Sequence, residues 1–201
     1  MPNFTDLTGL AGVASAATAS LLLLPGIARP ALRANLSKSH LAILLGTMFV
    51  LMLIPFGGVP LAAYVRGATG DLSITTLVLL WCALLRPWCC AAEANNRFAL
   101  LILIALAALA LYPMALGAGA YDPYRLGYGD LQLIVALLFI ALAAWLWKST
   151  LIALCIAFAT LAWAVGWYES NNLWDYLLDP FLSIYALATI ILNLAVKPVI
   201  K

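Results

Sequence analysis

Residues that could do chemistry gather in one stretch of the chain, from Gly166 to Pro180. The stretch holds three of the eight carboxylates, two of the seven tryptophans and two adjacent asparagines, and long apolar runs lie on both sides of it. Carboxylates can act as general acids or bases, and aromatic rings can pack on a polar ligand while amides bond to it. We therefore take this stretch as the first candidate for a functional site.

A second polar loop, from Gly119 to Asp130, adds an arginine and several tyrosines. Together the two segments offer one candidate ligand-binding set, which comprises Tyr124, Arg125, Trp167, Tyr168, Glu169, Asn171, Asn172, Trp174 and Asp175. If the protein is an enzyme, the sequence favours Glu169 or Asp175 as the acid or base. Arg125 would then contact a phosphate or a developing negative charge.

The same segments also have a structural interpretation. Asp71, Asp130 and Asp179 each precede an apolar run, where a carboxylate caps a helix and complements its dipole. Pro180 follows Asp179, as expected for the first position of a helix. Tryptophan and tyrosine are also common at the bilayer surface. The residues that this interpretation explains least well are Arg125, Glu169, Asn171, Asn172 and Asp175.

Asp175 and Asp179 are four residues apart, so a continuous helix would place both on one face. Like charges at that spacing repel each other. This pattern favours a nearby cation, Arg125 or a basic group of a partner.

Metal and redox centres are not predicted. The chain has a single histidine, His40, and its four cysteines contain no CxxC pair. No Asp, Glu, Lys or Arg falls in the middle of an apolar run, as proton-coupled pumps usually require. We expect no cofactor and no metal, and the sequence favours a protein without enzyme activity.

The composition is that of an integral membrane protein. Of the 201 residues, 66% are hydrophobic and 9% are charged, whereas soluble domains carry about 25% charged residues. So few charges cannot cover a water-facing surface, so the lipid bilayer is the expected main solvent. Scattered basic residues argue against nucleic-acid binding. The length fits one transmembrane domain over residues 1–201.

The apolar runs predict an all-α polytopic bundle with about seven transmembrane helices, and six remain an alternative. Prolines and glycines between Pro55 and Pro60 predict a kink or an end near Phe56. The first predicted helix is rich in small residues, which favour close packing inside the bundle or against a partner. The predicted helices are 7–28, 41–64, 72–85, 98–116, 131–147, 150–167 and 180–196, with an interfacial turn from Asn172 before the last.

The charged residues sort by side of the membrane. Eight of the ten Lys and Arg residues fall on alternate loops, and seven of the eight acids fall on the other loops. Basic loops stay cytoplasmic, so we expect the N-terminus outside and the C-terminus inside. The start of the chain lacks a positive n-region, so no cleaved signal peptide is expected. A bacterial inner membrane is the expected location.

Three functions are consistent with these patterns. The first is a non-catalytic membrane subunit that docks onto a membrane-protein partner through small-residue helix faces and an acidic, aromatic outer rim. The second is a solute-binding or transport subunit with an outward-facing site for a small polar ligand. The third is an enzyme that acts outside the membrane on a lipid-linked substrate. The inner loop 86–97, with Cys89 and Cys90, is a further candidate for partner docking or acylation.

Overall fold

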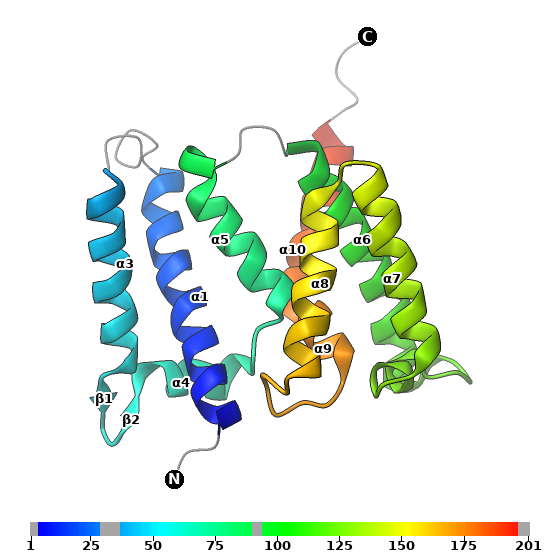
Figure 1. Ribbon diagram of the computed structural model, residues 1–201, viewed down its shortest axis with the longest axis horizontal. Coiled ribbons are helices and arrows are strands. Elements are labelled where there is room, and N and C mark those ends of the chain that lie inside the picture. The colour runs from blue at the N-terminus through cyan, green and yellow to red at the C-terminus, as the bar shows by residue number, and fades with distance from the viewer. Residues whose placement is uncertain (1–3, 29–36, 90–93, 197–201) are drawn as a thin grey trace. The chain divides into compact units, whose positions relative to one another are not determined.

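The computed structural model describes residues 4–28, 37–89 and 94–196, and helices form most of these segments (Figure 1). The predicted all-α fold is therefore confirmed. The elements are α1 (Phe4–Ala28), α3 (Lys38–Leu53), β1 (Pro55–Phe56), β2 (Val59–Pro60), α4 (Leu61–Thr69), α5 (Ile74–Cys89), α6 (Ala94–Pro113), the π-helix η1 (Met114–Ala118), the 3-10 helix η2 (Pro123–Gly127), α7 (Leu131–Leu146), α8 (Thr150–Ala164), α9 (Leu173–Leu177) and α10 (Pro180–Val196).

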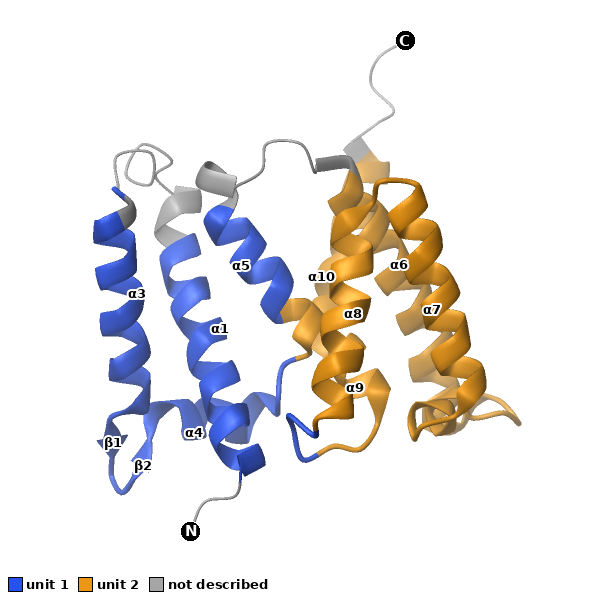
Figure 2. Ribbon diagram, in the orientation of Figure 1, with its two compact units in different colours: residues 1–72, 77–91, 166–169 blue, residues 73–76, 92–165, 170–201 orange. Residues whose placement is uncertain are grey.

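The chain divides into two compact units (Figure 2). Unit 1 lies within residues 1–72, 77–91 and 166–169. Unit 2 lies within residues 73–76, 92–165 and 170–201. The prediction of a single transmembrane domain over residues 1–201 stays a prediction, and each unit is described by itself below.

Unit 1 is built around the small residues of α1. This helix packs on α3 and α4, and Ala14 and Ala19 are fully buried there. Ala14 lies in a cluster with Val13 and Ala62, and the indole of Trp81 donates a hydrogen bond of 2.7 Å to the Ser15 hydroxyl. The small side chains let these helices approach closely, so the predicted packing of this helix inside the bundle is confirmed.

The predicted helix 41–64 is interrupted. Its first half is α3, which ends at Leu53. Proline lacks the backbone N–H that a helix needs, and at Pro55 the chain enters a two-stranded antiparallel hairpin in which Pro55 pairs with Pro60. The second half is the separate nine-residue helix α4. The chain therefore turns at this point, and α4 carries Arg66 into the site described below.

The long helices of unit 2, α6, α7, α8 and α10, alternate in direction along the chain (Figure 1). Helix α6 packs on α10 and α8, and α7 packs on α8. The turn between α7 and α8 is tight, since Lys148 adopts a positive φ of 60° and its carbonyl accepts a hydrogen bond of 3.2 Å from Asn96. The helices predicted at 131–147, 150–167 and 180–196 agree with α7, α8 and α10 within three residues at each end.

Two segments of the described residues are long and apolar enough to cross a membrane. They are Phe4–Leu23, with 20 residues, and Asn96–Ala118, with 23 residues. Five shorter apolar helices accompany them: Ser39–Leu53, Ile74–Leu85, Leu131–Leu146, Thr150–Ala164 and Pro180–Ala195.

Candidate functional site

The predicted ligand-binding residues are distributed over both units. Trp167, Tyr168 and Glu169 belong to unit 1. The other six belong to unit 2: Tyr124, Arg125, Asn171, Asn172, Trp174 and Asp175. Each unit therefore has its own cluster of polar groups.

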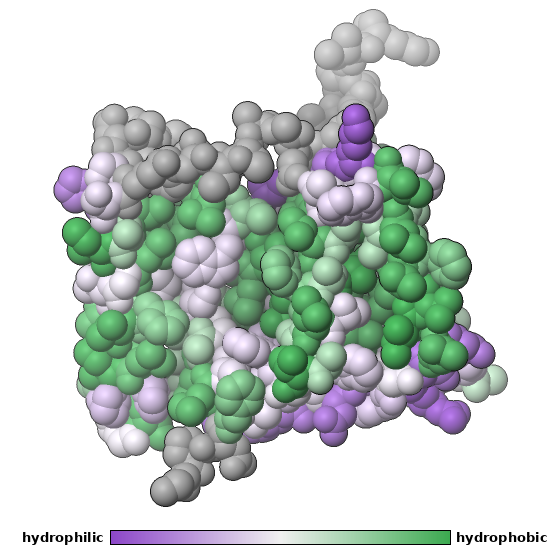
Figure 3. Space-filling model, in the orientation of Figure 1, coloured by the Kyte–Doolittle hydropathy of each residue, from purple (hydrophilic) through white to green (hydrophobic). Residues whose placement is uncertain are grey.

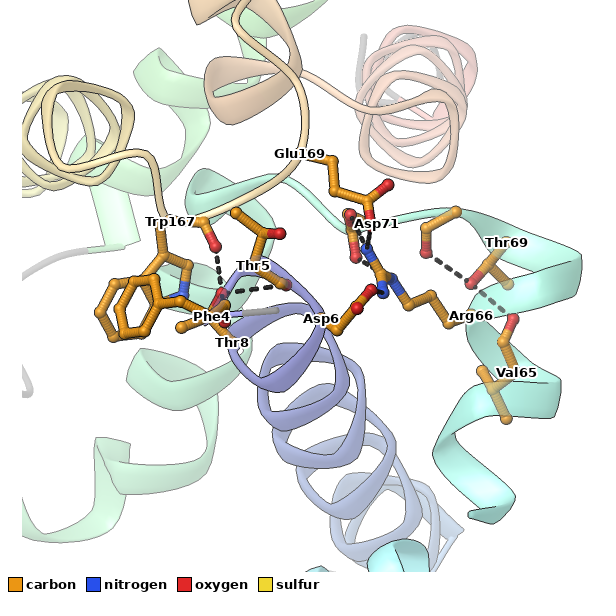
Figure 4. Close-up of polar contacts among 11 residues, drawn as sticks. Phe4, Thr5, Asp6, Thr8, Val65, Arg66, Thr69, Asp71, Trp167 and Glu169 are labelled. Atoms are coloured by element: carbon orange, nitrogen blue, oxygen red, sulfur yellow. Dashed lines mark hydrogen bonds and ion pairs between the residues drawn. The ribbon is translucent and has the colours of Figure 1, made fainter. Parts of the chain in front are cut away.

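In unit 1, three carboxylates surround one arginine (Figure 4). The Arg66 guanidinium donates two hydrogen bonds to Asp71, from Nε at 2.7 Å and from Nη2 at 2.9 Å. Its Nη1 donates to Asp6 at 3.3 Å, and its Nη2 lies 3.6 Å from the Glu169 carboxylate. We call these four residues the Arg66 cluster. The fork of the guanidinium matches a carboxylate, so the Asp71 pair is the strong contact.

The Arg66 cluster lies directly on the backbone of α1. A Cβ atom built on Gly9 would lie 2.7 Å from Asp71 Oδ1 and 2.8 Å from Arg66 Cζ. A side chain at position 9 would therefore displace the ion pair, so the close approach requires glycine there. Arg66 and Asp6 were not among the candidate residues of the sequence, because only the fold brings α1 and α4 together.

The charges of the three carboxylates affect the protonation of Arg66. The hydrogen bond to Asp71 and the nearby carboxylates raise the pKa of the Arg66 guanidinium above its ordinary value, although burial acts in the opposite direction. Arg66 and Asp71 are mostly buried, whereas the Glu169 side chain is 61% exposed. Because water screens exposed pairs, the Glu169 contact contributes little to stability. Glu169 is the most exposed member of the cluster.

Trp167 and Tyr168 pack on α1. The Thr8 hydroxyl donates a hydrogen bond to the Trp167 carbonyl, and the ring of Phe4 meets the Trp167 ring edge-on at 6.1 Å (Figure 4). Tyr168 is only 3% exposed. The structure therefore places Tyr168 in the interior of unit 1, and its predicted role in ligand binding stays a prediction.

In unit 2, the predicted polar loops meet at Asp175. The Tyr124 hydroxyl lies 3.0 Å from both Asp175 oxygens, to which it donates, and the Ser170 hydroxyl donates to Oδ2. Burial raises the pKa of the Tyr124 phenol, and the charge of Asp175 raises it further. Tyr124 therefore stays protonated and keeps donating. Asp175 is held by two neutral hydroxyls and by no cation among the described residues.

Asn172 joins the same two loops. It is fully buried, its side-chain oxygen accepts from the Trp174 N–H at 2.9 Å as the cap of α9, and its amide donates to the Tyr124 carbonyl at 3.0 Å. A Cβ atom on Gly127 would lie 1.7 Å from Asn172 Oδ1. This close approach joins residues that are far apart in the sequence, so it was not predicted from the sequence.

Arg125 and Asn171 do not join the Asp175 group. Arg125 is exposed, and within the described residues its guanidinium forms no ion pair. Of the three neighbours that the sequence offered for Asp175 and Asp179, which were a cation, Arg125 or a partner's basic group, Arg125 is not the one at Asp175, since Tyr124 occupies that carboxylate. Asn171 is also exposed, and its carbonyl accepts a hydrogen bond of 2.8 Å from the Trp163 indole.

Asp179 is a buried helix cap with several donors. Its Oδ1 accepts from the Leu182 N–H at 2.8 Å, and its Oδ2 accepts from both the N–H and the hydroxyl of Ser73, at 3.1 and 2.7 Å. The Thr76 hydroxyl also donates to Oδ2. The predicted cap at Asp179 is therefore confirmed.

The other predicted caps differ in outcome. Asp130 caps α7 through the Gln132 N–H at 2.7 Å, as expected. Asp71 does not cap α5, because it pairs with Arg66 and the Ser73 hydroxyl accepts from the Thr76 N–H instead.

Asp175 and Asp179 do not share a helix face. Helix α9 ends at Leu177, and Leu178 is extended, with a φ of −133°. The two carboxylates are therefore separated by a break in the helix, and each has its own neutral donors. The repulsion expected from a continuous helix does not arise.

Among the described residues, no group of three or more His, Cys, Asp and Glu side chains is arranged to hold a metal ion. In the inner-loop candidate, Cys90 and Glu93 lie outside the described residues. Compared with known protein families, curated proteins and solved structures, the chain shows no match.

Proposed function

We propose that the protein is a non-catalytic, polytopic membrane subunit that docks onto a larger membrane assembly. The supporting observation is the state of Asp175, one of the two candidate acid or base residues, and of Asp179 near it in the sequence. Asp175 and Asp179 are occupied by hydroxyl and backbone donors of their own unit. A catalytic base must instead reach a proton of its substrate. Both carboxylates therefore serve as structural acceptors that hold loops and helix ends in place.

The proposed topology has seven spans, with the N-terminus outside and the C-terminus in the cytoplasm of a bacterial cell. It is supported by the sorting of eight of the ten basic residues onto alternate loops. The two long apolar segments and the five shorter apolar helices would supply the spans. In this topology the Arg66 cluster and the Asp175 group both belong to outer loops.

Docking is assigned first to exposed residues of these outer loops. The small-residue face of α1 packs within unit 1, where Ala14 and Ala19 are already buried. Exposed polar and aromatic groups remain in each unit: Trp167 and Glu169 in unit 1, and Arg125 and Tyr128 in unit 2. Aromatic residues and arginine are enriched where proteins bind each other. We call these four residues the outer rim.

The test is purification of the tagged full chain from its native membrane in mild detergent, followed by mass spectrometry. The expected result is a stoichiometric protein partner. Two outer-rim variants, Glu169→Gln and Arg125→Gln, are expected to lower partner recovery several-fold without lowering Tm, because both side chains are exposed. Lys148→Gln, at the opposite end of α7, serves as the matched control with unchanged recovery.

A stable protein that purifies alone would contradict docking. A ligand screen would then separate the alternatives, because a solute-binding subunit gains thermal stability from its ligand. Turnover that is lost in Glu169→Gln without loss of folding would instead indicate an enzyme.

A further inference from the structure

Three helices of unit 2 are shorter than a typical bilayer is thick, whereas α6 and the π-helix after it form a 23-residue apolar segment. Helices α7, α8 and α10 contain 16, 15 and 17 residues. At about 1.5 Å per residue, they are about 22–26 Å long. The hydrocarbon core of a typical bilayer is about 30 Å thick, which corresponds to about 20 helical residues. Each helix is therefore several ångströms too short to span it while upright.

The apolar face of α7 has defined ends. Asp130 precedes the helix, and Lys148 follows it, with the 80% exposed Trp147 beside it. Charged groups and tryptophan prefer the headgroup region, so these residues fix where the hydrocarbon begins and ends. Figure 3 shows the hydrophobic surface over α7, with hydrophilic residues at both ends. The exposed apolar residues between these ends include Leu131, Leu138, Phe139, Leu142 and Leu146.

Neither end of α7 can lengthen by recruiting loop residues. At its start, the Asp130 side chain is bonded to the Gln132 N–H. At its end, the Lys148 carbonyl accepts from Asn96, and the Ser149 N–H bonds to the Ala144 carbonyl at 2.8 Å. These contacts terminate the helix within unit 2, so the apolar length is fixed by the fold.

We propose that the exposed face of α7 binds the acyl chains of a bilayer whose hydrocarbon core is thinner than about 30 Å. The inference rests on the membrane embedding in the proposed function. A short, fixed apolar face forces a thicker bilayer to thin locally or draws Trp147 and Lys148 toward the hydrocarbon. Either response disfavours the thick bilayer, so lipids with short acyl chains are the preferred partner.

The test is reconstitution of the full chain into phosphatidylcholine vesicles with fourteen-, eighteen- or twenty-two-carbon monounsaturated chains. Thermal unfolding in each lipid is the main readout. We expect the highest Tm in the fourteen-carbon lipid, with a difference of about 5 °C or more from the twenty-two-carbon lipid. Lipids with brominated acyl chains report contact, because they quench tryptophan fluorescence. Quenching is expected to fall in the double variant Trp145→Phe, Trp147→Phe, since both indoles are exposed.

The outcomes separate this inference from the proposed function. Protein that alkaline carbonate releases from every vesicle would overturn membrane embedding itself. Embedded protein whose Tm is independent of chain length, or highest in the longer lipids, would overturn only the preference for a thin bilayer. Embedded protein whose quenching is equal in the parent and the double variant would show that another protein, such as a second copy, covers α7 instead of lipid.

Discussion

The Arg66 cluster of unit 1 and the Asp179 cap of unit 2 satisfy carboxylates in two different ways. Asp71 is balanced by the full charge of a bidentate arginine, and Asp6 and Glu169 surround the same guanidinium. Asp179 is buried, with 4% exposure, and it is balanced by neutral hydroxyls and backbone N–H groups. Charge pairs respond to salt, whereas short neutral hydrogen bonds depend on exact placement. The two units should therefore respond differently to the same perturbations.

The largest effect on stability is expected at Gly127, where the Asn172 side chain leaves the least space for a Cβ atom. In Gly127→Ala the new methyl group would meet the Asn172 side chain at 1.7 Å. The loops must then move apart, which lowers the free energy of unfolding by about 3 kcal/mol. Thermal unfolding in detergent measures this change. Gly46→Ala is the matched control, since a Cβ there meets nothing within 4 Å, and an equal loss in both variants would contradict the steric argument.

Replacement of Asp179 should have the next largest effect. Asp179→Ala leaves the donors of Ser73 and Leu182 buried without an acceptor, which destabilises the protein by about 2–3 kcal/mol. Asp179→Asn retains an acceptor at the cap and should lose less. Because the donors are neutral, the loss in Asp179→Ala should be equal in low and high salt when Tm is compared.

Arg66→Gln should destabilise the protein by about 1–2 kcal/mol, because it leaves the mostly buried Asp71 without its cation. The loss should shrink in high salt, where the remaining carboxylates repel each other less. Unfolding measured at two salt concentrations checks this prediction. A loss in Arg66→Gln that does not change with salt would remove the distinction between the two units.

The smallest effect concerns pH. The pKa of Tyr124 is raised in the folded protein, so the unfolded chain loses this proton first, near its ordinary pKa of 10. Tyr124 contributes fully to the free energy of unfolding below that pH. This contribution is lost as pH rises, by at most about 1 kcal/mol per pH unit. Tyr124→Phe should flatten the fall of Tm above pH 10, and an unchanged slope would contradict this assignment. Arg66 titrates far above this range, so its cluster adds no such slope.

Local features of the sequence predicted local features of the structure. Apolar runs predicted the helices, prolines predicted the break near Phe56, and Asp130 and Asp179 were identified as caps because a cap bonds within its own first turn. These features depend on neighbours a few residues away. A short window of the sequence therefore contains all the residues that determine such a feature.

Partners that are distant in the sequence could not be predicted in this way. Asp6 meets Arg66 across 60 positions, and Tyr124 meets Asp175 across 51 positions. The spacing of these residues carries no trace of either contact. The sequence therefore selected Tyr124 and Asp175 as candidates without pairing them. It offered a cation, Arg125 or a partner's basic group as the neighbour of the carboxylate, and it assigned Asp71 as a cap. The shape of the fold decides which donor reaches which acceptor.

The segment 166–169 has a consequence for the synthesis of the chain. It belongs to unit 1, although the residues on both sides of it belong to unit 2. The Trp167 carbonyl accepts from Thr8, whose position in the chain is 159 residues earlier. A ribosome must therefore complete α1 to α8 before the start of α1 can find its last contacts. The N-terminal helix α1 lacks its contact with Trp167 until most of the chain has been synthesised. Unit 1 therefore cannot complete its folding before much of unit 2 has been made.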